Sequence, residues 1–82
     1  MQITTAIIKD FLNQQEFSFK EFSQSYTTII VVMDEHKLVC EAAASLARTY
    51  GFNCEYIQAL KLTRRGTFTV HQLKFKKGVA DV

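Results

Sequence analysis

Residues 26–33, YTTIIVVM, are the most strongly patterned stretch of this chain. Every residue from Thr27 to Val32 is branched at Cβ, and the resulting stiffness at χ1 suits a pleated sheet. The apolar run is continuous rather than alternating, which indicates apolar contacts on both faces of the strand. We therefore predict a central strand at Tyr26–Met33.

The residues that follow this run predict a helix ending near Gly51. Asp34 is expected to cap its free amides, and Glu35 beside it complements the positive end of the helix dipole. Gly51 suits the left-handed position that ends many helices. Apolar residues at helical spacing define the face that we expect to be buried: Leu38, Val39, Ala42, Ala43, Leu46, Ala47 and Tyr50.

The N-terminal segment, Ile3–Gln15, predicts a first helix. Its apolar residues recur at intervals of three and four, and Thr4 or Thr5 is able to cap the free amides at its start. Nothing in the sequence gives this helix a strong stop signal.

Residues Phe17–Ser25 carry two conflicting signals. Phe17, Phe19 and Glu21 alternate as they would in a strand, yet Ser18 followed by Glu21 is a capping box. We favour a short helix or turn here, with the strand as the alternative.

The C-terminal part predicts a β-hairpin from Cys54–Thr63 and Thr67–Lys76. Between them, Arg64-Arg65-Gly66 suits a type I turn closed by a glycine bulge. With this three-residue loop, Leu62 faces Phe68 and Leu60 faces Val70. The whole pattern predicts an α+β domain, with two helices on one face of a small, mainly antiparallel sheet that ends in a C-terminal hairpin.

Length and composition favour one folded domain over residues 1–82. The chain has 82 residues, of which 48% are hydrophobic, enough for a single aromatic-rich core. We expect residues 77–82 to fray. No apolar run reaches the roughly 18 residues of a transmembrane helix, and the N-terminus lacks a signal-peptide pattern. We therefore expect a cytoplasmic protein, or a nuclear one in a eukaryote, with no membrane partner.

Residues with catalytic or ligating side chains are sparse. Cys40 and Cys54 are expected to be small buried thiols rather than a disulfide or a metal site. His36 and His71 have no nucleophile at a recognisable spacing, and no glycine loop is present to hold a phosphate. We expect no catalytic residue, no metal and no cofactor, and hence a protein that is not an enzyme.

Charge is distributed unevenly along the chain. Residues 1–41 carry three lysines against six carboxylates, a net charge of −3, whereas residues 42–82 carry seven basic residues against two acidic ones, a net charge of +5. Such a basic segment attracts polyanions. Lysines that only keep a hairpin soluble would give the same charge distribution, so this alternative stays open. Six candidate nucleic-acid contacts follow: Lys61, Arg64, Arg65, His71, Lys74 and Lys76.

Phe68 and Phe75 interleave with these basic residues. An exposed aromatic ring on a sheet can stack on an unpaired base. We expect both rings to belong to the core instead, because a domain of this size needs large apolar groups in its interior.

The segment from His36 to Ala43, then Arg48–Phe52, then Arg65 leading into Thr67–Val70, resembles a family of single-stranded nucleic-acid-binding domains named for the Arg-x-x-x-His pair on its helix. In this chain His36 and Cys40 stand at the positions of that pair. The resemblance implies that Arg65 and His36 contact the ligand.

These observations predict a small non-catalytic module that binds RNA or single-stranded DNA through its basic hairpin. The alternative is a protein–protein interaction or inhibitor module that uses an exposed aromatic surface or an unpaired sheet edge, including as a homodimer.

Overall fold

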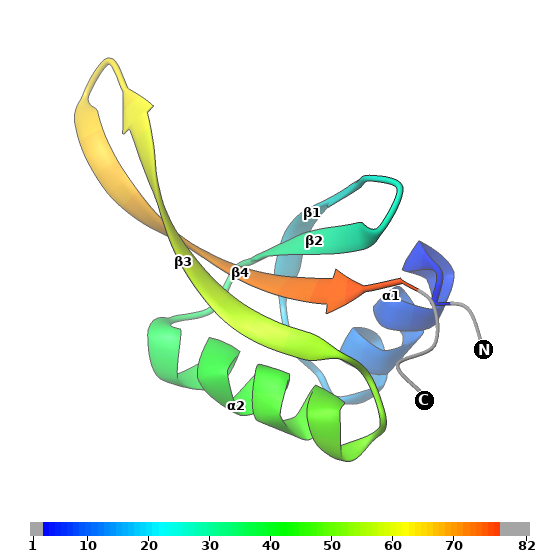
Figure 1. Ribbon diagram of the computed structural model, residues 1–82. Helices are drawn as coiled ribbons and strands as arrows, with labels where there is room; N and C mark the ends of the chain where they lie inside the picture. The colour runs from blue at the N-terminus through cyan, green and yellow to red at the C-terminus, as the bar shows by residue number, and fades with distance from the viewer. Residues whose placement is uncertain (1–2, 78–82) are drawn as a thin grey trace.

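A computed structural model describes residues 3–77, which form two helices and a four-stranded antiparallel sheet (Figure 1). The elements are α1 (Thr5–Gln14), β1 (Phe19–Gln24), β2 (Thr28–Met33), α2 (Lys37–Thr49), β3 (Cys54–Thr63) and β4 (Gly66–Lys76). The predicted α+β class and the C-terminal hairpin, β3–β4, are confirmed.

The sheet has the order β1-β2-β4-β3, and each neighbouring pair is antiparallel. The predicted central strand is therefore confirmed as β2, which lies between β1 and β4. Each helix is followed by two strands, and the second strand of each unit lies in the middle of the sheet. The units α1-β1-β2 and α2-β3-β4 thus have the same order of elements, and each forms one half of the sheet.

Both helices pack against the same face of the sheet, where they form one apolar core. Side chains of β2 alternate between this buried face and a half-buried one, so only one face of β2 is covered, whereas the continuous apolar run predicted contacts on both. The core consists of Ile3, Ile8, Phe11, Leu12, Ile29, Val31, Met33, Cys40, Ala43, Ala44, Ala47, Cys54, Leu73 and Phe75.

Helix α1 begins as predicted. The side chain of Thr4 accepts a hydrogen bond from the amide of Ile7 at 3.3 Å, which satisfies one of the free donors of the first turn. The helix ends at Gln14 with Gln15 as its C-cap, and Glu16, the next residue, adopts a left-handed backbone with φ of +63°. The amide of Phe17 then bonds to the carbonyl of Leu12 at 3.0 Å and closes the helix end.

The preference for a helix or turn at Phe17–Ser25 is wrong, because this segment contains strand β1. A bulge between Phe19 and Glu21 interrupts the pairing of β1 with β2. The extra residue turns Phe19 and Phe22 toward the core together, with ring centroids 5.2 Å apart. The bulge therefore breaks the two-residue alternation by which a strand is recognised in sequence.

The expected cap and buried face of α2 also need correction. The N-cap is His36, without a side-chain cap bond, so Asp34 does not cap the helix. Glu35 instead accepts a hydrogen bond from the amide of Ser18 at 2.8 Å and links the start of α2 to β1. The buried face is rotated toward small side chains, which allow the helix to lie close to the sheet, while Leu38 is 71% exposed. The buried residues are Cys40, Ala43, Ala44 and Ala47.

The register predicted for the hairpin is wrong by one residue. Thr63 pairs with Gly66, which has a φ of +118°, so the loop contains only Arg64 and Arg65. The Thr63 hydroxyl donates to the Gly66 carbonyl at 2.9 Å and accepts from the Arg65 amide at 3.2 Å, which closes this short turn. A shift of one residue in register exchanges the faces on which side chains pair. Leu62 is consequently opposite Thr67 rather than Phe68.

The hairpin extends well beyond the rest of the sheet (Figure 1). Pairing of β2 with β4 ends at Val32 and Gln72, so the last part of the hairpin has no partner in β2. We call residues 58–71 the arm. The amide of Lys77 donates to the carbonyl of Thr27 at 2.8 Å, and the rest of the tail predicted to fray, residues 78–82, lies outside the described residues.

Glu16→Gly is expected to raise the free energy of unfolding by about 0.5–1 kcal/mol, because a side chain makes the left-handed backbone unfavourable. Gln15→Gly is the matched control. Gln15 has a φ of −90°, which any residue adopts, so glycine at this position removes no backbone strain. It lowers the free energy of unfolding instead, because glycine increases the conformational entropy of the unfolded chain. Urea titrations of both variants measure the difference, and a loss of stability in Glu16→Gly would contradict the prediction.

Candidate nucleic-acid interface

The face of the sheet opposite the helices, which we call the open face, carries the central group of candidate residues. On β4 the side chains of this face alternate with the buried Leu73 and Phe75. The cross-strand pairing assigns its other members. They are Glu21, Ser23, Thr28, Ile30, Val32, Glu55, Ile57, Ala59, Lys61, Phe68, Val70, Gln72, Lys74 and Lys76.

Three candidate lysines share the open face. Lys61, on β3, is opposite Phe68 near the end of the arm. Lys74 and Lys76 are on β4, where Lys74 is flanked by β2 and β3 and Lys76 is opposite Thr28 of β2. From Phe68 to Lys76, β4 covers about 27 Å at the usual rise of a strand. The lysines therefore form an extended row rather than a compact cluster.

Arg64 and Arg65 form the loop at the tip of the arm, and both are exposed. No described acidic residue forms an ion pair with them within 4.0 Å. Their charges therefore add to those of the row formed by Lys61, Lys74 and Lys76.

His71 lies apart from the other five candidates, on the helix side of β4. Its Nδ1 is 2.6 Å from the hydroxyl of Tyr56, and the two rings stack with centroids 5.9 Å apart. Burial, followed by the nearby Cys40 and Glu41, raises the pKa of Tyr56. The structure thus places His71 in a contact with Tyr56 on the face opposite the lysines.

Acidic residues also occur on the open face and limit its positive potential. Glu55 is directly opposite Lys74, and Glu21 lies on β1. At the rim, Lys20 and Asp34 approach to 4.0 Å, but both side chains are exposed and such a pair contributes little to stability. Positive charge is consequently least compensated toward the tip of the arm.

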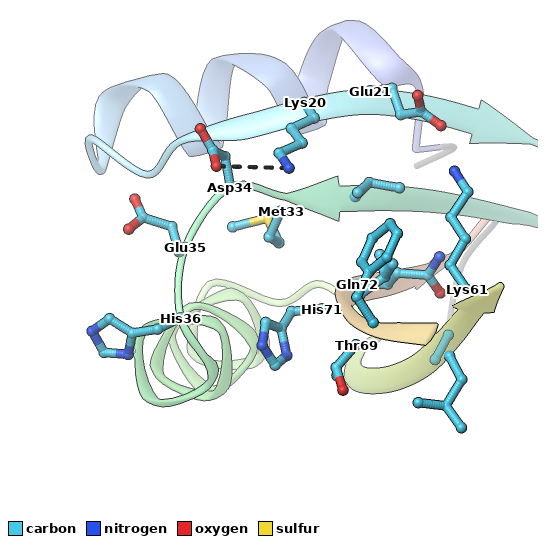
Figure 2. Close-up of a pocket in the computed structure, with 15 residues that line it drawn as sticks. Lys20, Glu21, Met33, Asp34, Glu35, His36, Lys61, Thr69, His71 and Gln72 are labelled. Atoms are coloured by element: carbon cyan, nitrogen blue, oxygen red, sulfur yellow. Dashed lines mark ion pairs between the residues drawn. The ribbon is translucent and has the colours of Figure 1, made fainter. Parts of the chain in front are cut away.

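A cleft of about 730 Å³ lies where β4 diverges from β2 (Figure 2). One wall is formed by the start of β1, the end of β2 and the turn that leads into α2, and the other by the arm. Phe68, 48% exposed, contributes an aromatic surface, and Lys20 and Lys61 contribute positive charge. His36, the second contact implied by the family resemblance, also lines this cleft. The carboxylates of Glu21, Asp34 and Glu35 line the cleft as well, so its acidic side chains outnumber its two lysines and the positive charge of the hairpin is not concentrated here.

The two aromatic rings of the hairpin differ in position. Phe75 is 1% exposed, within the core, which confirms the expectation for this ring. Phe68 is on the open face, outside the core, so that expectation is wrong for it. The reason is geometric, because the register of β4 directs Phe68 to the open face, which no helix covers, and the arm has no neighbouring strand of β2 there.

Sequence reasoning misses Lys20 and Glu21 as members of this cleft. Both come from β1, which the sequence analysis favoured as a helix or turn. The alternation of Phe17, Phe19 and Glu21 was the one signal that could have brought them into the sheet.

Both thiols are buried, as predicted: Cys40 is 0% exposed and Cys54 is 3% exposed. Burial, with a smaller effect of Glu35, raises the pKa of Cys40 to about 11. Burial also raises the pKa of Cys54 to about 12, although Arg48 acts in the opposite direction. At neutral pH both sulfurs are therefore protonated and weakly nucleophilic.

Within residues 3–77, no group of three or more His, Cys, Asp or Glu side chains is arranged to hold a metal ion. None of the helices in the described part of the chain has the length and apolar character needed to cross a membrane.

Comparisons with known protein families, curated proteins and solved structures find no match for this chain. The resemblance to the nucleic-acid-binding family therefore stays a prediction.

Maleimide is expected to label Cys40 and Cys54 slowly in the native protein at pH 8 and rapidly in urea. The native sulfurs are protonated and buried, whereas unfolding exposes them and returns their pKa values to about 9.0. Mass spectrometry of the labelled protein over time measures both rates. Equal rates in buffer and urea would show that the thiols are accessible in the folded state.

Proposed function

We propose that this domain binds single-stranded RNA or DNA, without catalysis, across the open face and the tip of the arm. The observation that carries the proposal is the exposure of Phe68 on an uncovered antiparallel sheet, beside Lys61 and next to the Arg64-Arg65 loop. An aromatic ring and neighbouring cations are the two elements with which proteins hold unpaired strands.

The basic side chains would act on the phosphates. Lys61, Lys74 and Lys76 follow the length of the open face, and Arg64 and Arg65 continue the row at its end. Neutralising a phosphate releases condensed counterions, so binding by such a row weakens as salt rises. Guanidinium groups also form bidentate bonds to phosphate oxygens, which makes the arginine loop the strongest anchor.

The open face favours a single strand over a duplex because its contacts suit exposed bases. Phe68 presents a ring that a base can stack on, and half-buried aliphatic side chains of the central strands lie further along the same face. Base faces in a duplex are already stacked on one another, so they cannot use these groups.

Replacing Arg64 and Arg65 together with Ala is expected to leave the melting temperature nearly unchanged, since exposed charges contribute well under about 1 kcal/mol. Affinity for a labelled single-stranded oligonucleotide is expected to fall, and the slope of log affinity against log salt to flatten by about 1.4 if each arginine contacts one phosphate. Fluorescence anisotropy at several salt concentrations measures both quantities.

The double variant Lys9→Ala/Lys37→Ala is the control, because it removes the same charge from the two helices, which cover the opposite face of the sheet (Figure 1). Its salt slope should match that of the wild type. Equal slopes for all three proteins would place the contacts elsewhere. Absence of any binding at low salt would reject the proposal and leave the open face to a protein partner.

Phe68→Ala is expected to weaken binding to a single strand by about 1–3 kcal/mol, which is the usual contribution of one base stacked on an aromatic ring. Leu62→Ala is the control, since Leu62 is also exposed on the arm but points to the opposite face. Anisotropy titrations with the same oligonucleotide compare the two variants. A similar loss in both would argue against stacking on Phe68.

A further inference from the structure

The outer edge of β3 offers a row of unpaired backbone groups. The amide of Lys76 donates to the carbonyl of Asn53 at 2.9 Å, so odd-numbered residues of β3 direct their backbone bonds toward β4. The backbone N–H and C=O groups of the even-numbered residues of β3 therefore point away from β4, toward the outer edge of the sheet. The bond of 3.0 Å from Arg48 Nη1 to the carbonyl of Cys54 agrees with this, because it reaches that carbonyl from outside the hairpin. Beyond Cys54, the outward groups belong to Tyr56, Gln58, Leu60 and Leu62.

Beyond Cys54, this edge lacks the bulge, the short length and the proline that often protect the edge of a sheet. The other edge strand, β1, is six residues long and interrupted by a bulge, which discourages pairing with another chain. By contrast, β3 runs for ten residues in regular register with β4 and contains no proline. Leu60 and Leu62 on this strand are 77% and 81% exposed. Long, regular edges with exposed apolar side chains are pairing sites.

We propose that a second copy of this chain pairs with β3 in antiparallel fashion, about a two-fold axis at Gln58. The pairing joins two four-stranded sheets into one eight-stranded sheet, with the helices of both copies on one side. Its backbone bonds form along the outer edge of β3, so the dimer does not require a nucleic acid to be bound.

Charge complementarity selects this register. Glu55 and Lys61 are the two charged residues of β3, and both lie on the open face. A two-fold axis at Gln58 places each Glu55 opposite Lys61 of the second copy, forming two cross-strand ion pairs. An axis one residue further along, at Ala59, would shift the pairing by two residues, place Lys61 opposite Ile57 and leave both charges without partners.

The same register covers the exposed leucines. Leu60 comes to lie opposite Tyr56 of the second copy, on the helix side of the sheet, and Leu62 lies opposite Cys54. Tyr56 is close to Cys40 and Glu41, so this part of β3 lies over α2. Figure 1 shows that the arm extends past the end of its own α2, which leaves its helix side uncovered. In the dimer, the arm of each copy lies beside α2 of the other.

Reversal of charge tests the register. Sedimentation equilibrium without nucleic acid is expected to give a dimer for the wild type. Glu55→Lys and Lys61→Glu each turn two attractive pairs into two repulsive ones, and each should raise the dimer dissociation constant about tenfold or more. The double variant restores opposite charges and should return the constant toward the wild-type value. Glu21→Lys, the control, makes the same charge change on β1 and should leave it unchanged.

Hydrogen exchange supplies a second readout that does not depend on any substitution. In the dimer, the amides of Tyr56, Gln58 and Leu60 should be protected, and dilution to monomer should expose them while Ile57 and Ala59 stay protected by β4. A monomeric wild type at high concentration would overturn the proposal. A dimer that resists both single reversals, or fails to recover in the double variant, would overturn it equally.

Discussion

Pairing of β2 with β4 is the interaction on which the rest of this structure depends. The two strands bring Ile29 opposite Phe75 and Val31 opposite Leu73, and all four side chains are buried. These residues come from opposite halves of the chain, so their contact closes the loop that contains α2 and β3. Both helices then have a single apolar surface to cover, and β1 and β3 take the outer positions because the two centres are occupied.

Much of this fold could be predicted from sequence where the pattern is local. The β-branched run identified β2, and Thr4 marked the start of α1. The failures have a common cause, which is a small local feature with a large effect on geometry. A bulge hid β1, and one residue more or less in the loop at Arg64 reversed the faces of the hairpin. The sequence around Gly66 is compatible with either loop, and the two-residue loop is the one in which the Thr63 side chain bonds to both Arg65 and Gly66.

The candidate site could also be predicted only in part from the sequence. Sequence identified which residues are basic, but only the register shows which of them share a surface. Lys61, Lys74 and Lys76 share one, whereas His71, two residues from a buried leucine, lies on the other side with Tyr56. Exposure of Phe68 could not be predicted either, because it depends on how far the hairpin extends past the end of β2 rather than on the character of the phenylalanine itself.

The core and the arm of this small protein differ in how freely their amino-acid sequences can change. Core positions such as Ala43 and Ala47 leave no room for a larger side chain, so their sequence is held by the packing of α2 on the sheet. Residues at the end of the arm make few contacts with that core and have little influence on whether the chain folds. Selection can therefore alter the composition and length of the arm at little cost in stability. A scaffold of this kind is able to acquire new ligands quickly while its fold stays constant.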